Sequence, residues 1–166
     1  AITDGHGLLD KDRDWGARIS QSPGVNPGKC ADIAELTQTK MSKPNATNGC
    51  ASWAIPASLA KPIRRVIKYT HELPSLVTKL SREAAEAMYE AMLAGDGGCV
   101  RPGYWVFSQW QKKRKPIAEA FQILCALLGK AANFREAEYD DGPRYQVSVR
   151  TSKHFKPSRN SAMLPY

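Results

Sequence analysis

Four consecutive cations form the sharpest chemical feature of the sequence: Lys112, Lys113, Arg114 and Lys115. Cations this close repel one another, and a bound anion relieves that repulsion. Pro116 follows at a position typical of a helix start, where the free backbone N–H groups of the first turn can receive phosphate oxygens. We therefore expect a phosphate backbone to bind here, and a solvated loop without a ligand is the alternative.

The positive charge of the chain is concentrated in its last third. Residues 1–100 carry 12 Lys and Arg against 11 Asp and Glu, whereas residues 101–166 carry 12 against 5, within a formal net charge of +8. Four further basic residues complete the predicted binding set: Arg144, Arg150, Lys153 and Lys156. Such a surface attracts polyanions, so the expected partner is nucleic acid or an acidic protein surface.

Aromatic residues are interleaved with this charge, at Tyr104, Trp105, Phe107, Trp110, Tyr139 and Tyr145. In a strand, Tyr104 and Trp110 would share one side while Trp105 and Phe107 share the other, so at most one side faces water. Exposed rings would stack on unpaired bases, each worth about 1–3 kcal/mol. The more common role of such rings is to fill the core.

A second constellation centres on Cys50, which follows Gly49 and precedes an apolar stretch with Trp53. The segment 47–54 resembles the nucleophile segment of papain-like hydrolases, although the Trp is not adjacent to the Cys. This resemblance implies a thiolate at a helix N-terminus with His154 or His71 as its base. A cysteine-dependent hydrolase or toxin-like effector is therefore the alternative function, but the sequence favours a binding protein over an enzyme.

No metal or cofactor is expected. The four cysteines form no Cys-x-x-Cys pair, and the three histidines are scattered. Asp10, Asp12 and Asp14 are spaced like the start of a calcium loop, but Gly16 falls one place late and Gln21 stands where that loop has Glu. Helix capping or solvated charge accounts for these carboxylates.

The cysteines also bear on the cellular compartment. Cys30, Cys50, Cys99 and Cys125 could form two disulfides in three connectivities, but Cys125 lies in an apolar helical pattern and is interpreted as a buried free thiol. No export signal is visible in residues 1–14, and no apolar run reaches the roughly 18 residues of a membrane helix. We expect an intracellular protein, cytoplasmic or nucleoid-associated and without a membrane partner, and secretion stays open.

These residues belong to one predicted domain, 1–166, of the α+β class: a helical middle segment with a small C-terminal antiparallel sheet. Residues 1–50 are rich in turn formers, with one short helix predicted over 32–41. Segment 56–94 predicts two helices. The first has Pro62 in its first turn and ends at Pro74, and the second starts at Ser75 or Ser81 and stops at Gly95.

Segment 104–150 is predicted as strand, helix and hairpin, followed by a basic tail, 151–166. The strand covers 104–111, the helix runs from Pro116 to Gly129, and the hairpin pairs 134–139 with 144–150. An apolar stripe on the helix should pack on the strand side that carries Trp105 and Phe107; it consists of Ile117, Phe121, Leu124 and Leu128.

Two known arrangements resemble this last segment. Residues 116–150 resemble the helix, strand and strand that open a double-stranded-RNA-binding domain, including the Gly142-Pro143 turn, but that family's third strand and lysine-rich second helix have no counterpart here. The hairpin, with Arg135, Arg144 and Arg150, also fits a winged arrangement in which a helix enters a groove. A protein-interaction or inhibitor module with a basic surface is the remaining alternative, and DNA is not distinguished from RNA.

Overall fold

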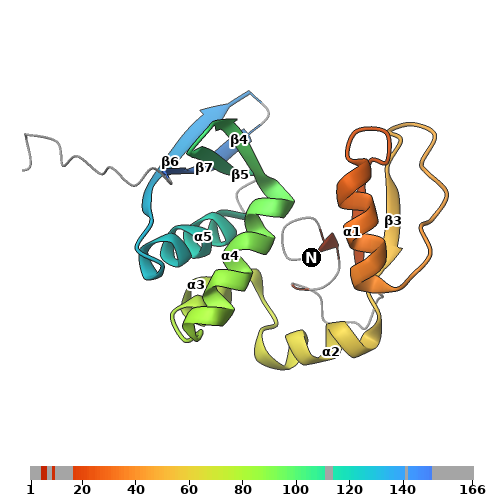
Figure 1. Cartoon of the computed structure of the whole chain (residues 1–166), viewed down its shortest axis with the longest axis horizontal. Coiled ribbons are helices and arrows are strands. Elements are labelled where there is room, and N and C mark those ends of the chain that lie inside the picture. Colours follow the sequence, from red (N-terminus) through yellow and green to blue (C-terminus); the bar gives the residue numbers. More distant parts are fainter. Residues whose placement is uncertain (1–4, 7–8, 10–16, 111–113, 141, 151–166) are drawn as a thin grey trace, which may run out of the picture.

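Two antiparallel sheets and five α-helices make up the part of the chain that the computed structural model describes, residues 5–6, 9, 17–110, 114–140 and 142–150. Figure 1 shows α1 and β3 on one side of the molecule and the larger sheet on the other, with α2 along the bottom. The predicted α+β class, with a small C-terminal antiparallel sheet, is confirmed.

The N-terminal part is more ordered than its turn-rich composition indicates. Three short strands, β1 (Gly5–His6), β2 (Arg18–Gln21) and β3 (Ala51–Ala54), form an antiparallel sheet in that order. Strands of two to four residues are too short to show alternation in the sequence. Trp53 on β3 is buried with Cys30 and Ala51 in a small cluster of their own.

Helix α1 (Pro27–Thr37) starts and ends earlier than the predicted 32–41. Pro27 stands at the first helical position, where a proline loses no hydrogen bond, so the sequence Asn26-Pro27-Gly28, which is typical of a turn, begins a helix instead. The helix ends at Gln38, which adopts a left-handed conformation with φ of 53°.

The prediction for Pro62 was wrong. It lies inside α2 (Ala57–Val66) rather than in a first turn, although an interior proline removes one backbone hydrogen bond. The chain leaves that helix at Ile67, which is extended. Pro74 does not end a helix either, because it stands in the first turn of α3 (Leu73–Val77), directly after the 3₁₀ turn η1 (Thr70–Glu72).

Ser81, one of the two predicted helix starts, caps α4 (Arg82–Asp96). Its hydroxyl accepts a hydrogen bond from the backbone N–H of Ala84. The helix passes through Gly95 and continues directly into β4 (Gly97–Arg101), a strand that the sequence analysis missed. Gly97 and Gly98, which follow the predicted stop at Gly95, begin this edge strand.

The C-terminal sheet has the strand order β4-β5-β7-β6, and all neighbours are antiparallel. It comprises β5 (Tyr104–Trp110), β6 (Ala131–Tyr139) and β7 (Gly142–Arg150), and α5 (Lys115–Leu127) joins β5 to β6. The predicted strand, helix and hairpin are therefore confirmed. The winged arrangement is not, because β7 is a central strand that pairs with both β5 and β6, and α5 buries its apolar side against the sheet.

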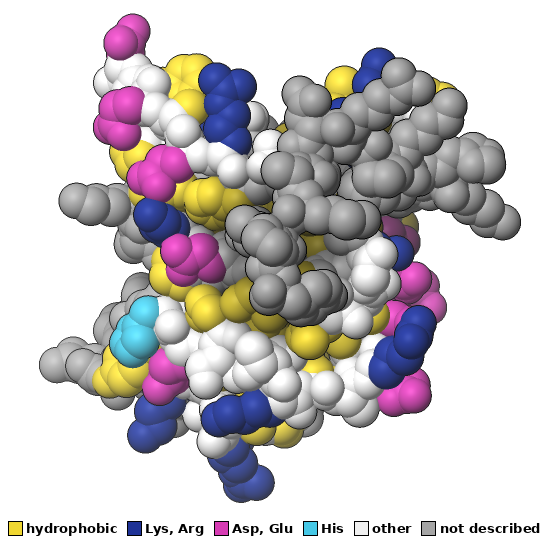
Figure 2. Space-filling view, turned by 90° about the vertical axis from the view of Figure 1, so that its left-hand side faces the viewer, with side chains coloured by type: hydrophobic (Ala, Val, Ile, Leu, Met, Phe, Trp, Pro, Cys, Tyr) yellow, Lys and Arg dark blue, Asp and Glu magenta, His cyan; other side chains and the backbone are white. Residues whose placement is uncertain are grey.

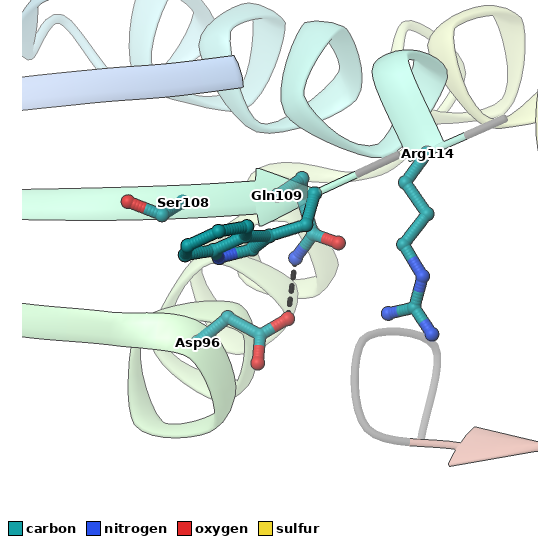
Figure 3. Close-up of a pocket in the computed structure, with 5 residues that line it drawn as sticks. Asp96, Ser108, Gln109 and Arg114 are labelled. Atoms are coloured by element: carbon teal, nitrogen blue, oxygen red, sulfur yellow. Dashed lines mark hydrogen bonds between the residues drawn. The ribbon is translucent and has the colours of Figure 1, made fainter. Parts of the chain in front are cut away.

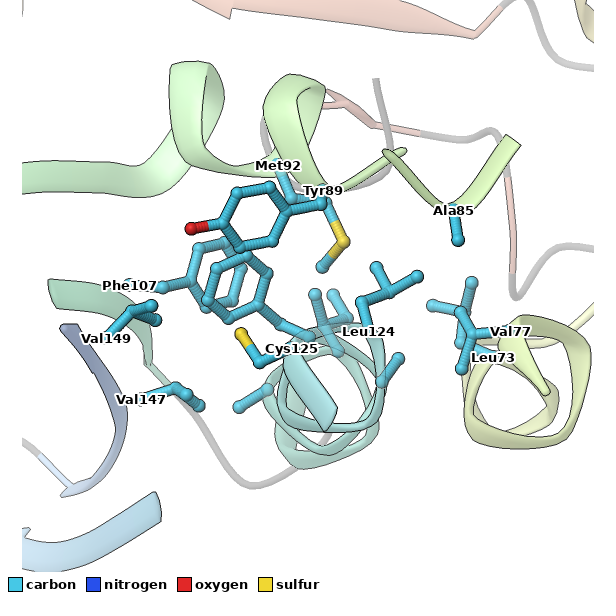
Figure 4. Packing of buried hydrophobic residues seen from close by; sticks show 14 of the residues in the cluster. Leu73, Val77, Ala85, Tyr89, Met92, Phe107, Leu124, Cys125, Val147 and Val149 are labelled. Atoms are coloured by element: carbon cyan, nitrogen blue, oxygen red, sulfur yellow. The ribbon is translucent and has the colours of Figure 1, made fainter. Parts of the chain in front are cut away.

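The main core lies between α5 and one side of this sheet (Figure 4). The ring of Phe121 stacks between Phe107 on β5 and Tyr89 on α4, with centroid distances of 4.3 and 5.3 Å. Ile117, Phe121 and Leu124 are buried and Leu128 is partly buried, which confirms the predicted stripe. Among the described residues, no helix is both long enough and apolar enough to cross a membrane.

Candidate nucleic-acid interface

No described helix packs against the side of the C-terminal sheet that faces away from α5, and we call this side the outer face. Alternate residues of a strand point to opposite sides, so the observed pairing register assigns each residue to a side. On β7 the inner residues Tyr145, Val147 and Val149 are fully buried, whereas the outer positions are half-buried or exposed. The principal side chains of the outer face are Arg101, Tyr104, Val106, Ser108, Trp110, Asn133, Arg135, Ala137, Tyr139, Arg144, Gln146, Ser148 and Arg150.

The pleat of β6 separates its charges by sign. Arg135 and Tyr139 are outer residues, whereas Glu136 and Glu138 lie on the other side of the same strand. Among the outer positions that the structure describes, four carry arginine and none carries Asp or Glu. Elsewhere on the surface both signs lie side by side, as Figure 2 shows for one side of the molecule. The outer face is thus a region of one sign.

One end of the outer face carries an arginine held between two aromatic rings. The guanidinium carbon of Arg144 lies 3.4 Å from the ring centroid of Trp110 and 4.2 Å from that of Tyr139. Both rings are well exposed, at 44% and 42%. The Nε atom of Arg144 is buried, and no described residue accepts a hydrogen bond from it. Stacking therefore fixes the position of this cation.

The other end repeats the pairing of arginine with an aromatic ring. The guanidinium of Arg101 lies 5.4 Å from the ring centroid of Tyr104, and Arg150 stands opposite Tyr104 in the register. Arg144 and Arg150 are six residues apart on β7, which at about 3.3 Å per residue separates the two ends by about 20 Å. Small and polar outer residues lie between them.

A pocket of about 370 Å³ opens beside Trp110, where α4 ends and α5 begins (Figure 3). Its other lining residues are Asp96, Ser108, Gln109 and Arg114. Gln109 is buried, and its side-chain amide donates a hydrogen bond to the Asp96 carboxylate. Ser108 and Trp110 belong to the outer face as well, so the pocket is continuous with it.

The structure describes four of the eight predicted basic residues, and it does not gather these four in one patch. Arg114 lines the pocket, and Arg144 lies on the outer face near it, while Arg150 occupies the far end of that face. Lys115 instead pairs with Glu136 at 2.8 Å on the other side of the sheet, and this carboxylate raises the pKa of the lysine. Four predicted residues lie outside the described residues: Lys112, Lys113, Lys153 and Lys156.

The geometry around Cys50 differs from what a hydrolase needs. Cys50 directly precedes β3, and its backbone N–H donates to the side chain of Asn48, so the thiol stands at a strand start rather than a helix N-terminus. His71 lies exposed in η1, stacked on Tyr69 with ring centroids 5.5 Å apart. The other candidate base, His154, lies outside the described residues. We therefore make no hydrolase proposal.

All four cysteines are free in the structure, and Cys125 is a buried thiol as predicted. Burial raises its pKa to about 12. Within the described residues, no three His, Cys, Asp or Glu side chains come together to hold a metal ion.

The sequence analysis missed part of this surface. Arg101 belongs to the unpredicted strand β4, and Asp96 lies in the last turn of α4, one residue beyond the predicted helix stop at Gly95. Gln109 shares the side of the strand with Trp105 and Phe107, opposite Trp110, and the sequence analysis gave its amide no role. The available signal was the spacing of Gln109, which follows Trp105 and Phe107 at every second position. A polar side chain at such a position is expected to be buried and to need a hydrogen-bond partner.

Comparisons with known proteins add no functional information. Neither the comparison with protein families nor the comparison with curated protein sequences finds a match to this chain.

Proposed function

We propose that this protein binds nucleic acid along the outer face, with the arginines contacting phosphates. The observation that carries the proposal is the separation of charge by the pleat: the described outer positions hold four arginines and no carboxylate, and the glutamates of β6 lie on the opposite side. A phosphate backbone presents a row of negative charges, so an extended face of one sign is complementary to it.

The aromatic residues favour nucleic acid over an acidic protein as the partner. Charge alone would serve either, but Tyr104, Trp110 and Tyr139 each stand among arginines at the ends of the outer face. Rings beside cations are the combination that binds single strands, because bases stack on the rings while the cations follow the backbone. Four-stranded sheets with exposed aromatics can accommodate two or three bases in this way.

The salt dependence of binding tests this proposal. A double variant, Arg135→Gln with Arg150→Gln, removes two exposed outer cations and leaves the inner side of the sheet unchanged. Each phosphate contact contributes about −0.7 to the slope of log K against log salt for single strands. We expect weaker binding and a slope smaller in magnitude by about 1.4, measured by fluorescence anisotropy with a labelled oligonucleotide.

The matched control is Lys61→Gln with Lys79→Gln, which removes the same charge from exposed positions on α2 and after α3. This variant should keep both the affinity and the slope. If the two double variants weakened binding equally, net charge alone would explain the interaction, and the proposal would be wrong. Tighter binding of polyglutamate than of nucleic acid at equal salt would instead favour the protein-interaction alternative.

A further inference from the structure

The arginines of the outer face differ from Arg82 and Lys115 in their ionic contacts. Arg82 and Lys115 each pair with a glutamate, at 3.0 and 2.8 Å. Among the described residues, no carboxylate pairs with any of the four outer arginines, which are Arg101, Arg135, Arg144 and Arg150. Their charge is therefore available to an anion from outside the protein.

The pairing register arranges these cations along the direction of β7. Arg144 stands at one end, and Arg135 on the neighbouring strand lies one outer position further along. At the other end, Arg101 and Arg150 both stand opposite Tyr104 in the register. The row is about 20 Å long, which is about six nucleotides at the 3.4 Å spacing of a stacked strand and fewer when the strand is extended.

The two ends of this row differ in chemistry. At the Arg144 end, the rings of Trp110 and Tyr139 stay exposed at 44% and 42%, although the guanidinium lies against both. At the other end, two arginines stand beside a single half-buried ring, that of Tyr104. The first end therefore offers stacking surface to bases, and the second offers mainly positive charge to phosphates.

We propose that the outer face binds a single strand lengthwise along β7. Bases stack on Trp110 and Tyr139, and phosphates about 20 Å further along the strand contact Arg101 and Arg150. Bases inside a duplex are stacked on one another and offer no free ring surface to these side chains. This inference rests on the proposed function and names its substrate, a single strand long enough to reach both ends.

The test measures fluorescence anisotropy with four labelled probes: a dT trinucleotide, hexanucleotide and decanucleotide, and a duplex of ten base pairs. A strand that reaches both ends gains the second contact as an intramolecular step. We expect affinity to rise about tenfold or more from the trinucleotide to the hexanucleotide, and little from there to the decanucleotide. The duplex should bind about fivefold or more weakly than the decanucleotide, because its bases cannot stack on the rings.

Variants separate the two ends. Arg101→Gln with Arg150→Gln should reduce the salt slope by about 1.4 for the decanucleotide and leave that of the trinucleotide unchanged, because charges about 20 Å away are screened beyond a Debye length of about 8–10 Å. Trp110→Leu should weaken the binding of both strands about fivefold or more.

Tryptophan emission reports on the stacking end in the unlabelled trinucleotide complex. Binding should quench this emission, and Trp110→Phe should abolish the quenching while the matched variant Trp105→Phe, on the inner side of β5, keeps it. The inference is wrong, and the proposed function still stands, if affinity rises evenly with length, if the duplex binds as tightly as the decanucleotide, or if quenching persists in Trp110→Phe. Absence of salt-dependent binding to any probe would overturn both.

Discussion

At the scale of single residues, the four cysteines differ most in their surroundings. Cys99 is exposed on β4, whereas Cys125 is fully buried against the sheet, where loss of hydration disfavours the charged thiolate. The thiolate is the reactive form, so reactivity follows both exposure and pKa. The two thiols should therefore respond very differently to the same reagent.

We expect iodoacetamide at pH 8 to alkylate Cys99 in the native protein and to spare Cys125. The pKa of Cys125 is raised to about 12, so at pH 8 its thiol stays protonated as well as inaccessible. Peptide mass spectrometry after alkylation, with and without guanidinium, measures both rates. Cys125 should react only when guanidinium unfolds the protein, and equal native rates for the two thiols would contradict the packing described for α5.

The same residues show what sequence can reveal at this scale. The burial of Cys125 and Phe121 follows from helical periodicity, which the sequence displays directly. The stacking of Arg144 on Trp110 does not, because the two residues are 34 positions apart and meet only through the register of β5 with β7. Arg144 was predicted as a phosphate contact beside a turn, and its sandwiched position could not be inferred.

At the scale of elements, the junction of α4 with β4 is the tightest connection in the fold. Gly97 follows the last helical residue directly, and a Cβ atom there would collide with the carbonyl oxygen and side chain of Leu93. Only glycine permits the strand to leave the helix at this angle. Local composition predicted a stop at this point, and the continuation into a strand depends on pairing with β5, which is a tertiary contact.

Gly97→Ala should lower the free energy of unfolding by about 1–3 kcal/mol, because backbone must shift to admit the methyl group. Gly98→Ala is the matched control, since a Cβ atom there meets nothing closer than the Val106 carbonyl oxygen at 4.0 Å. Urea denaturation of both variants and the parent chain provides the comparison. Equal stabilities of the two variants would mean that the junction is looser than described.

At the scale of the whole molecule, the buried residues are divided unequally. Sixteen of those described form the cluster around α5 and the C-terminal sheet, whereas two clusters of four and three residues support the N-terminal sheet. Ile63 on α2 packs against both the largest cluster and the cluster of four, and so connects the two parts. The platform of the outer face is therefore also the most extensively packed region.

Amide hydrogen exchange should follow this division. Regions with many buried apolar contacts open at a free energy near that of global unfolding, whereas sparsely packed regions open locally. We expect peptides from α5 and β7 to exchange most slowly and those from β2 and β3 to exchange faster, as measured by mass spectrometry in native buffer. Uniform protection across both sheets would show that the chain unfolds as one cooperative unit.

Because side chains alternate along β7, mutations on its two sides should affect the stability of the fold differently. Tyr145, Val147 and Val149 maintain the fold, while Gln146 and Ser148 can be exchanged for other residues with stability changes typically within about 0.5 kcal/mol. Outer residues such as these can therefore be replaced, in evolution or by design, while the core residues stay the same. Inserting one residue would do the opposite, because a one-position shift turns the valines toward water and the arginines toward α5.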